Sequence, residues 1–248
     1  MELELTPFTY HRATGRADAL THLSREGACA YAGGTDLLVG LRHRAGWVSG
    51  VRHLVDVKDV HDARGIQLHG DMLRIGALCT AQELASSSIV RRMARVLAVA
   101  ASQTSAPWLR ARGTVGGNVM TPHPAGDIAT ALLALGAIAE VATHGHRRTE
   151  RIALAELMSQ GRTNSLLLAL HVQAAAQSWY ERSSRRSAFC RATVAVAVVH
   201  RGTGTQVALG GVAERPILGS SAPAGSPLTS VVEALVERTT RGAATRRR

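Results

Sequence analysis

Two short stretches, Ala32-Gly33-Gly34-Thr35-Asp36 and Thr114-Val115-Gly116-Gly117-Asn118, decide how this chain is interpreted. Each centres on a glycine pair that is followed by short polar residues. Glycine lacks a Cβ, so its backbone amide can approach an anion closely and its φ angle can be positive. The first stretch also leads into an expected helix at Leu37, whose N-terminus carries partial positive charge. Two such loops facing each other predict a site for a diphosphate.

Side chains in and after these loops add polar groups to the predicted site. Thr35 and Thr114 offer hydroxyls, and Asn118 offers an amide donor. Asp127 follows nine residues after Asn118 and can accept a hydrogen bond from a ribose or a ring donor. Neither stretch matches the dinucleotide fingerprint G-x-G-x-x-G or the P-loop, and a single Gly-Gly-Thr turn is more often structural. Each loop alone therefore predicts only an anion site.

The hydrophobic pattern predicts an α+β chain of 248 residues with three successive units. Residues 1–58 form a small βαβ-type unit, with helices at 16–24 and 37–44 and strands at 28–32 and 51–57. The first glycine stretch stands directly after the earlier strand. This position is typical of a turn that presents backbone amides to a ligand.

Residues 59–177 are expected to form a larger unit. Glycine-containing turns at 69–71 and 143–145 predict two hairpins. Thr80 followed by Glu83 predicts a capping box at the start of a helix. The other expected elements are a helix at 89–101, a loop rich in glycine and proline at 102–124, an apolar helix at 127–135 and a strand at 166–172.

The last unit, residues 178–248, is expected to be small. A strand pair at 193–200 and 206–210 is followed by a Ser/Ala/Pro/Gly segment at 219–227. A short helix is expected at 231–237, and the arginine-rich end is expected to be disordered.

The net charge of +11 comes almost entirely from arginine, because Lys58 is the only lysine. Proteins that bind nucleic acid usually combine a basic stripe with aromatic residues or a recognition motif. Here aromatics are 3% of residues and the arginines are scattered, so no nucleic-acid binding is predicted. An arginine-rich composition of mutational origin is the preferred explanation. Steering of an acidic partner or an anionic substrate is the alternative.

The sequence also argues against membrane spans, disulfides and metal sites. No run of about 18 apolar residues occurs, and the first residues lack the features of a signal peptide. Cys29, Cys79 and Cys190 are far apart and odd in number, which predicts neither a disulfide framework nor a cysteine-ligated cluster. We expect a cytoplasmic protein. The eleven histidines are scattered and predict no metal site. His123 is either a loop residue, which is the preferred interpretation, or an acid or base beside the cofactor.

The order and spacing of the motifs resemble those of the FAD-binding subunits of molybdenum hydroxylases. This family includes the medium subunits of carbon monoxide dehydrogenase and xanthine dehydrogenase. The likeness covers residues 1 to about 215. Its matching segments are both glycine stretches, Ile75-Gly76-Ala77, Arg112-Gly113, Pro124-Ala125-Gly126-Asp127 with the apolar run 131–135, residues 180–186, and Leu209-Gly210-Gly211-Val212. The combination of both loops with Pro-Ala-Gly-Asp is highly specific.

The resemblance implies a fold of the vanillyl-alcohol-oxidase type. In it, two α/β subdomains hold FAD between them and a sheet domain, truncated here, follows. It implies that residues 32–36 and 114–118 hold the pyrophosphate and that Asp127 contacts the adenosine or ribityl part. The apolar strand at Leu167 and Leu168 would lie near the flavin. Arg182 stands where the family commonly has lysine, and its guanidinium can face an electron-rich flavin edge.

Three departures from the family pattern weaken the expectation of the usual assembly. Residues 162–165 stand in for a Gly-Glu-Leu segment, and Gln173 stands where the strand normally ends in proline. The C-terminal domain, which helps to pack such subunits against partners, is reduced to a strand pair and one helix.

These observations lead to two hypotheses of function, a subunit of a larger complex and an enzyme that acts alone. The leading one is an FAD-binding oxidoreductase subunit that receives electrons from separate molybdenum-binding and [2Fe–2S] subunits and passes them to NAD or another acceptor. The alternative is a stand-alone FAD-dependent oxidase or monooxygenase that acts on a small molecule in specialised metabolism. A degenerate subunit without FAD is a third possibility, against which the intact glycine loops count. The sequence identifies no catalytic residue.

Overall fold

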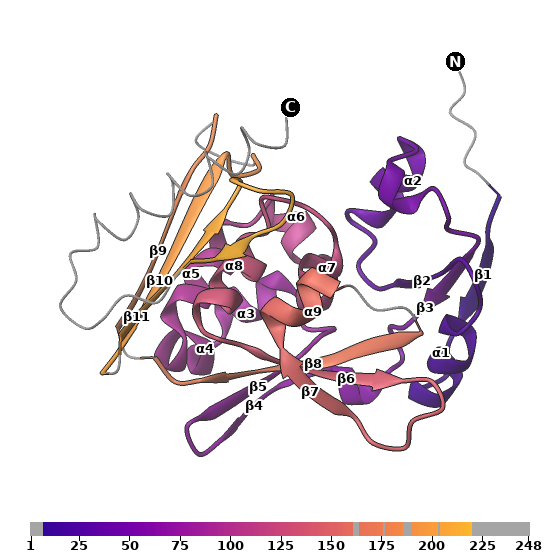
Figure 1. Cartoon of the computed structure of the whole chain (residues 1–248), viewed down its shortest axis with the longest axis horizontal. Coiled ribbons are helices and arrows are strands. Elements are labelled where there is room, and N and C mark those ends of the chain that lie inside the picture. The colour runs from indigo at the N-terminus through magenta and orange to yellow at the C-terminus, as the bar shows by residue number, and fades with distance from the viewer. Residues whose placement is uncertain (1–6, 161–163, 176, 186–189, 203, 220–248) are drawn as a thin grey trace.

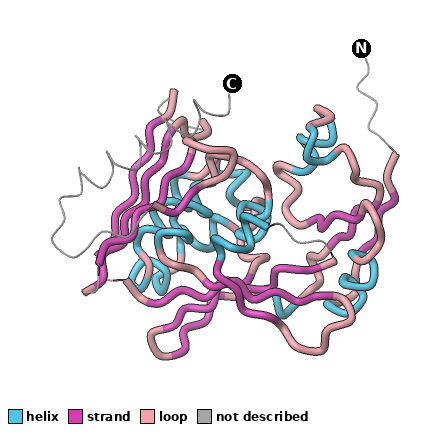
Figure 2. The backbone as a smooth tube through the Cα atoms, viewed as in Figure 1, coloured by secondary structure: helices cyan, strands magenta, loops and turns pink. Residues whose placement is uncertain are grey.

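The computed structural model describes residues 7–160, 164–175, 177–185, 190–202 and 204–219. Three separate sheets and a group of short helices make an α+β fold, as predicted (Figures 1 and 2). The sheets occupy residues 9–56, 66–173 and 177–218. The division of the chain at residues 58 and 177 stays a prediction. No helix in these ranges is long and apolar enough to cross a membrane.

The N-terminal sheet has the order β1 (Thr9–Arg12), β3 (His53–Asp56) and β2 (Ala28–Tyr31). Both of its strand pairs are parallel. Parallel neighbours need a crossover connection. Helix α1 (Arg16–Leu23) and helix α2 (Leu37–Arg42) with the 3₁₀ turn η1 (Gly46–Val48) supply the two crossovers. The βαβ-type unit is therefore confirmed, and β1 is a strand that the sequence pattern did not reveal.

The middle sheet is antiparallel throughout, in the order β4 (Ile66–His69), β5 (Met72–Gly76), β8 (Ser165–Gln173), β6 (Ile138–Thr143) and β7 (Glu150–Ala153). Both predicted hairpins are confirmed. The 3₁₀ turn η2 (His61–Ala63) precedes β4, the first strand of this sheet. The central strand β8 is buried from Leu166 to Val172, because hydrophobic clusters cover both of its faces.

Seven helices of the middle unit are described, and most are short. They are α3 (Ala81–Ser86), α4 (Ser88–Met93), α5 (Arg95–Gln103), α6 (Pro107–Arg110), α7 (Val115–Met120), α8 (Asp127–Ala134) and α9 (Leu154–Gln160). The capping box of Thr80 and Glu83 starts α3 as predicted. The single helix predicted at 89–101 is wrong, because Ala94 leaves the helical region at φ −148° and ψ 61°. The adjacent Met93 carbonyl accepts a hydrogen bond from the amide of Ala175 at 2.8 Å, so a contact distant in sequence accompanies this break.

The third sheet is larger than the predicted strand pair. Its order is β12 (Ile217–Leu218), β11 (Gly204–Gly210), β10 (Val194–Arg201) and β9 (Gln177–Ser183), all antiparallel. Helix α8 packs against β10 and β11, which joins this sheet to the middle unit. The predicted helix at 231–237 and the basic end lie outside the described residues.

A charged cluster joins three strands of the middle sheet. Glu140 on β6 lies 2.8 Å from the Nε2 atom of His171 on β8, and 3.6 Å from the Nε atom of Arg74 on β5. Burial raises the pKa of the Glu140 carboxyl, but the His171 hydrogen bond and the Arg74 charge outweigh it, so its pKa is lowered. A lowered carboxyl pKa means that this group stabilises the fold above its unfolded pKa and loses that contribution as pH falls.

We therefore expect Glu140→Gln to lower the free energy of unfolding by about 1 kcal/mol at neutral pH. The difference from the wild type should shrink below about pH 4, since glutamate in unfolded chains has a pKa of about 4.3. Urea unfolding at pH 7 and pH 3.5 measures both values. The exposed Glu156→Gln on α9 is the matched control and should change little at either pH. If Glu140→Gln lowers the free energy of unfolding equally at both pH values, the charge of Glu140 does not stabilise the fold.

Candidate cofactor site

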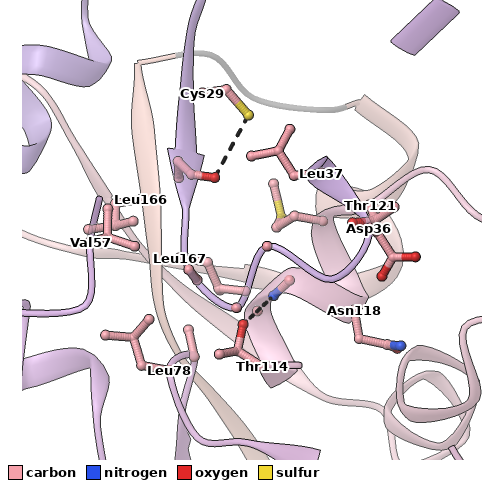
Figure 3. A pocket seen from close by; sticks show the side chains of 18 of the residues that line it. Cys29, Asp36, Leu37, Val57, Leu78, Thr114, Asn118, Thr121, Leu166 and Leu167 are labelled. Carbon is pink, nitrogen blue, oxygen red and sulfur yellow. Dashed lines mark hydrogen bonds between the residues drawn. The ribbon is translucent and has the colours of Figure 1, made fainter. Parts of the chain in front are cut away.

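A cavity of about 960 Å³ lies between the N-terminal unit and the middle unit. This volume is at the upper end of the usual range for small-molecule and cofactor pockets. Figure 3 shows its polar side chains Asp36, Thr114, Asn118 and Thr121 among apolar ones. Nine predicted site residues line it: Ala32, Gly33, Gly34, Thr35, Asp36, Thr114, Gly116, Gly117 and Asn118.

The two glycine stretches lie against each other. A Cβ added to Gly33 would stand 2.1 Å from the carbonyl oxygen of Arg112, and one added to Gly113 would stand 3.5 Å from the hydroxyl of Thr35. Real Cβ atoms do not approach a backbone oxygen to 2.1 Å, so only glycine fits at position 33. The structure thus brings the predicted loops together, and glycine at position 33 permits the contact.

The first stretch presents free backbone donors. In the described ranges, the amides of residues 32–37 donate to no protein acceptor. Gly34 has φ +72°, and a Cβ there would lie 2.5 Å from the ring of Tyr31. Amides that are unpaired in a folded chain need water or a ligand to accept from them. Several of them side by side at a cavity wall suit an anionic group.

The second stretch is organised differently from the prediction, because it is helical. Thr114 caps α7, and its Oγ1 atom accepts from the amide of Gly117 at 3.1 Å. The amides of Val115, Gly116 and Asn118 donate to the carbonyls of Cys79, Ala77 and Thr114. The predicted loop at 102–124 therefore contains two helices, α6 and α7, and the amides of residues 115–118 are already engaged.

Side chains, and not backbone amides, are what the second stretch presents to the cavity. The Thr114 oxygen accepts from Gly117, so its hydroxyl hydrogen remains able to donate (Figure 3). The Oδ1 atom of Asn118 accepts from the amide of Ala129 at 3.0 Å. This bond fixes the orientation of the Asn118 amide group and leaves its NH₂ as a donor. The glycines serve packing, since a Cβ at Gly116 would lie 2.9 Å from that of Ala77.

Gly117→Val is expected to weaken cofactor retention by disturbing this cap. A Cβ at position 117 would lie 2.9 Å from the Oγ1 atom of Thr114. The branched side chain would displace the hydroxyl from both the cap and the cavity. Loss of an N-cap costs about 1 kcal/mol. We expect a several-fold higher dissociation constant, measured by flavin fluorescence after reconstitution. Thr114→Ser, which keeps the hydroxyl, is the matched control. Equal cofactor occupancy in Gly117→Val and the wild type would mean that the cap does not shape the site.

Asp127 is placed differently from the prediction and does not line the cavity. It is 4% exposed at the start of α8, where its carboxylate accepts from the hydroxyl of Tyr180 and lies 3.3 Å from Arg182. Burial raises the pKa of Asp127, although Tyr180 and Arg182 act in the opposite direction. The carboxylate is thus engaged with protein donors and not with the cavity, and its expected contact with a ribose or ring stays a prediction.

Arg182 and Leu168 also lie outside the cavity wall. The guanidinium of Arg182 is held by Asp127 and by the carbonyls of Gln103 and Cys190. Leu168 is 1% exposed in the cluster that packs against α1, and a β-bulge in β8 interrupts the register at this position. Packing within this cluster takes up the Leu168 side chain and keeps it away from the cavity. Its neighbours Leu166 and Leu167 line the cavity instead.

Several lining residues were not found from the sequence. Arg110 lines the cavity, and within the described residues its buried Nε atom has no hydrogen-bond partner. An arginine with a free donor suits an anionic ligand. The only sequence signal for this region was the density of glycine and proline at 102–124. The other unpredicted lining residues include Cys29, Trp47, Val57, Leu78, Thr121, Ile128, Leu157 and Arg215.

His123 lies in the loop after α7, where protein groups engage both of its ring nitrogens. Its Nδ1 atom accepts from the amide of Ala125 at 3.0 Å, and its Nε2 atom contacts Arg191. Burial and the charge of Arg191 lower the pKa of His123. Arg191 also binds the Asp36 carboxylate at 2.7 Å, so it ties the first glycine stretch to the loop after α7.

Comparison with known families gives one match that covers most of the chain. Residues 6–172 match the family described as the FAD binding domain in molybdopterin dehydrogenase. The medium chain of carbon monoxide dehydrogenase from Hydrogenophaga pseudoflava is 31% identical over 207 residues, which are 81% of this chain and 71% of that protein.

Solved structures agree with this comparison. Carbon monoxide dehydrogenase from Hydrogenophaga pseudoflava, in the form that lacks the Mo-pyranopterin moiety, superimposes with a TM-score of 0.78 at 26% identity, over 87% of this chain and 78% of that chain. Quinoline 2-oxidoreductase from Pseudomonas putida 86 superimposes with a TM-score of 0.77 over 98% of both chains. At 19% identity, the latter likeness shows the fold alone.

Proposed function

Because the chain belongs to the family of FAD-binding domains of molybdopterin dehydrogenases, we propose that it passes electrons from a molybdenum hydroxylase partner to NAD or another acceptor. FAD is its cofactor, as the resemblance of the sequence implied. The observation that carries the proposal is the juxtaposition of the two glycine stretches at the wall of one large cavity.

The residues present fit FAD. The cavity has the volume of a large cofactor site, and the free amides of residues 32–37 suit a diphosphate. We assign the diphosphate to these amides, with the Thr114 hydroxyl and the Asn118 NH₂ as further donors. The absence of a Cβ at Gly33 and Gly34 lets this stretch lie against the Arg112 carbonyl and the Tyr31 ring, which places its amides at the cavity wall.

When bound, FAD supplies the redox chemistry, and the protein orients it and tunes its environment. Part of the cavity wall is apolar and excludes water. It is formed by Leu166 and Leu167 from β8 and by Ile128 from α8. The Asn118–Ala129 hydrogen bond fixes one donor before the ligand arrives. Preorganised donors lose little freedom on binding, which strengthens retention.

Molybdenum-binding and [2Fe–2S] subunits are the partners that we propose. Clusters of the [2Fe–2S] type need several cysteine thiolates close together. Cys29, Cys79 and Cys190 are all free, and they lie on β2, between β5 and α3, and between β9 and β10 respectively. The chain therefore needs other chains to deliver electrons from a molybdenum centre.

The alternative hypothesis of a stand-alone flavoenzyme was based on a shortened C-terminal unit and an altered strand at Leu167. The structure has four strands in the C-terminal sheet, and β8 runs over nine residues. Both observations reduce the support for the alternative.

The test begins with the purified chain reconstituted with FAD under anaerobic conditions. We expect flavin absorbance to co-elute with the protein and NADH to bleach it. We also expect the chain to co-purify with molybdenum-binding and [2Fe–2S] subunits when it is isolated from its native host. A protein that retains no FAD contradicts the assignment of the site. A flavin that NADH leaves oxidised, but that partner subunits reduce, points to another acceptor. Turnover of a small molecule by the chain alone favours the stand-alone enzyme.

A further inference from the structure

Three side chains that could bind a metal meet on the surface of the N-terminal unit. His11 lies on β1, and Asp18 and His22 lie one turn apart on α1. The Nε2 atom of His11 is 3.1 Å from Asp18 Oδ2, and the Nε2 atom of His22 is 3.4 Å from Asp18 Oδ1. All three side chains are partly buried, at 18–35% exposure. They do not line the FAD cavity.

The 3.4 Å between His22 Nε2 and Asp18 Oδ1 matches an edge of a metal coordination shell. Zn²⁺ binds histidine nitrogen and carboxylate oxygen at about 2.0–2.2 Å in tetrahedral geometry. Ligand atoms on such a tetrahedron lie about 3.3 Å apart. The nitrogen and oxygen atoms of the cluster all lie within 4.8 Å of one another. Three protein ligands leave a fourth position for water, so the site would be open to solvent.

Hydrogen bonds orient the carboxylate of Asp18. Its Oδ2 atom accepts from the amide of Thr14 at 2.9 Å and from the Thr14 hydroxyl at 3.3 Å. These bonds leave Oδ1, the atom nearer to His22, as the metal-binding oxygen. Such outer partners hold metal ligands in place and raise affinity.

The two imidazole rings are stacked, with centroids 3.3 Å apart and planes at 15°. Coordination requires the rings to tilt apart, because each lone pair lies in its ring plane, and the broad χ2 preference of histidine permits this.

We propose that His11, Asp18 and His22 form a binding site for Zn²⁺ or a similar divalent transition metal, which fastens α1 to β1. Imidazole and carboxylate ligands together favour such ions over Ca²⁺ or Mg²⁺. Helix α1 ends at Leu23, and residues 23–27 line the FAD cavity. The site thus holds an element that leads directly into the cofactor wall.

The test uses the tag-free, FAD-loaded chain after treatment with EDTA. Isothermal titration with ZnCl₂ should show one site per chain, and zinc should co-elute on gel filtration. Asp18→Asn and His22→Ala should each weaken that site at least about tenfold. His69→Ala, which changes an exposed histidine at the end of β4, is the matched control and should leave the site intact. Flavin absorbance verifies that each variant is folded.

Zinc K-edge X-ray absorption of the wild type gives a readout that does not depend on variants. We expect a nitrogen and oxygen shell, scattering from two imidazole rings and no sulfur. Sulfur ligation, or absence of the imidazole scattering, would overturn the proposal. So would zinc binding that survives His22→Ala, or a wild type that binds no more zinc than Asp18→Asn.

Discussion

Gly33→Ala is expected to reduce the affinity for FAD by about ten- to a hundredfold. The added Cβ would stand 2.1 Å from the carbonyl oxygen of Arg112 and 3.1 Å from the Cα atom of Gly113. Both atoms belong to backbone, so neither can rotate away and the two stretches must separate. Overpacking of this kind costs about 1–3 kcal/mol, and 1.4 kcal/mol corresponds to a tenfold change in affinity. The cost falls on binding because the displaced amides are the proposed phosphate donors.

Fluorescence titration of the cofactor-free chain with FAD measures this effect. Gly50→Ala is the matched control, since a Cβ there meets nothing within 4 Å. Its dissociation constant should equal that of the wild type. Circular dichroism should show that Gly33→Ala remains folded. If the folded variant binds FAD as tightly as Gly50→Ala does, residues 32–36 do not hold the diphosphate.

Asp127→Leu is expected to destabilise the fold by about 3 kcal/mol. The substitution leaves Arg182, which is 9% exposed, without its carboxylate, and leaves the buried hydroxyl of Tyr180 without an acceptor. Breaking a buried ion pair from one side costs about 3–5 kcal/mol. The lower end applies because Arg182 still donates to the carbonyls of Gln103 and Cys190. Urea unfolding of the cofactor-free chain measures the loss.

Two further variants distinguish a structural from a cofactor-binding role for Asp127. Combining Asp127→Leu with Arg182→Met should recover part of the loss, because the unpaired charge is then removed as well. Tyr180→Phe should cost less than Asp127→Leu, since it removes one hydrogen bond and no charge. In buffer without urea, where the Asp127→Leu variant is folded, it should bind FAD nearly as tightly as the wild type. A large loss of FAD affinity in the folded variant would restore the contact that the sequence predicted.

The family and the cofactor could be predicted from the sequence because each motif is a local signal and the order of the motifs along the chain carries the resemblance. A glycine pair after an apolar strand needs no tertiary information to indicate close backbone approach. The same holds for the capping box of α3 and for both hairpins of the middle sheet, which depend on residues within one turn of chain. The comparisons confirm the family that these motifs indicated.

Predictions failed where distant parts of the chain compete with local preference. Ala94 is a good helix former, yet the helix breaks there beside a contact with Ala175. Leu168 looked like a flavin-facing residue from its place in an apolar strand, but it packs in the cluster that includes residues of α1 and does not line the cavity. His11 and His22 are scattered in sequence, and the β1–α1 packing stacks their rings.

The sequence by itself determined that the chain has two glycine stretches that can approach another group closely, and it predicted that both serve one anionic cofactor. Only the tertiary structure decided which of the two stretches offers unpaired backbone amides. The amides of residues 32–37 are free, whereas those of residues 115–118 are taken up by α7 and its contacts with strand and turn carbonyls. Whether a backbone donor is free depends on what the rest of the chain brings to it, and no local pattern records that.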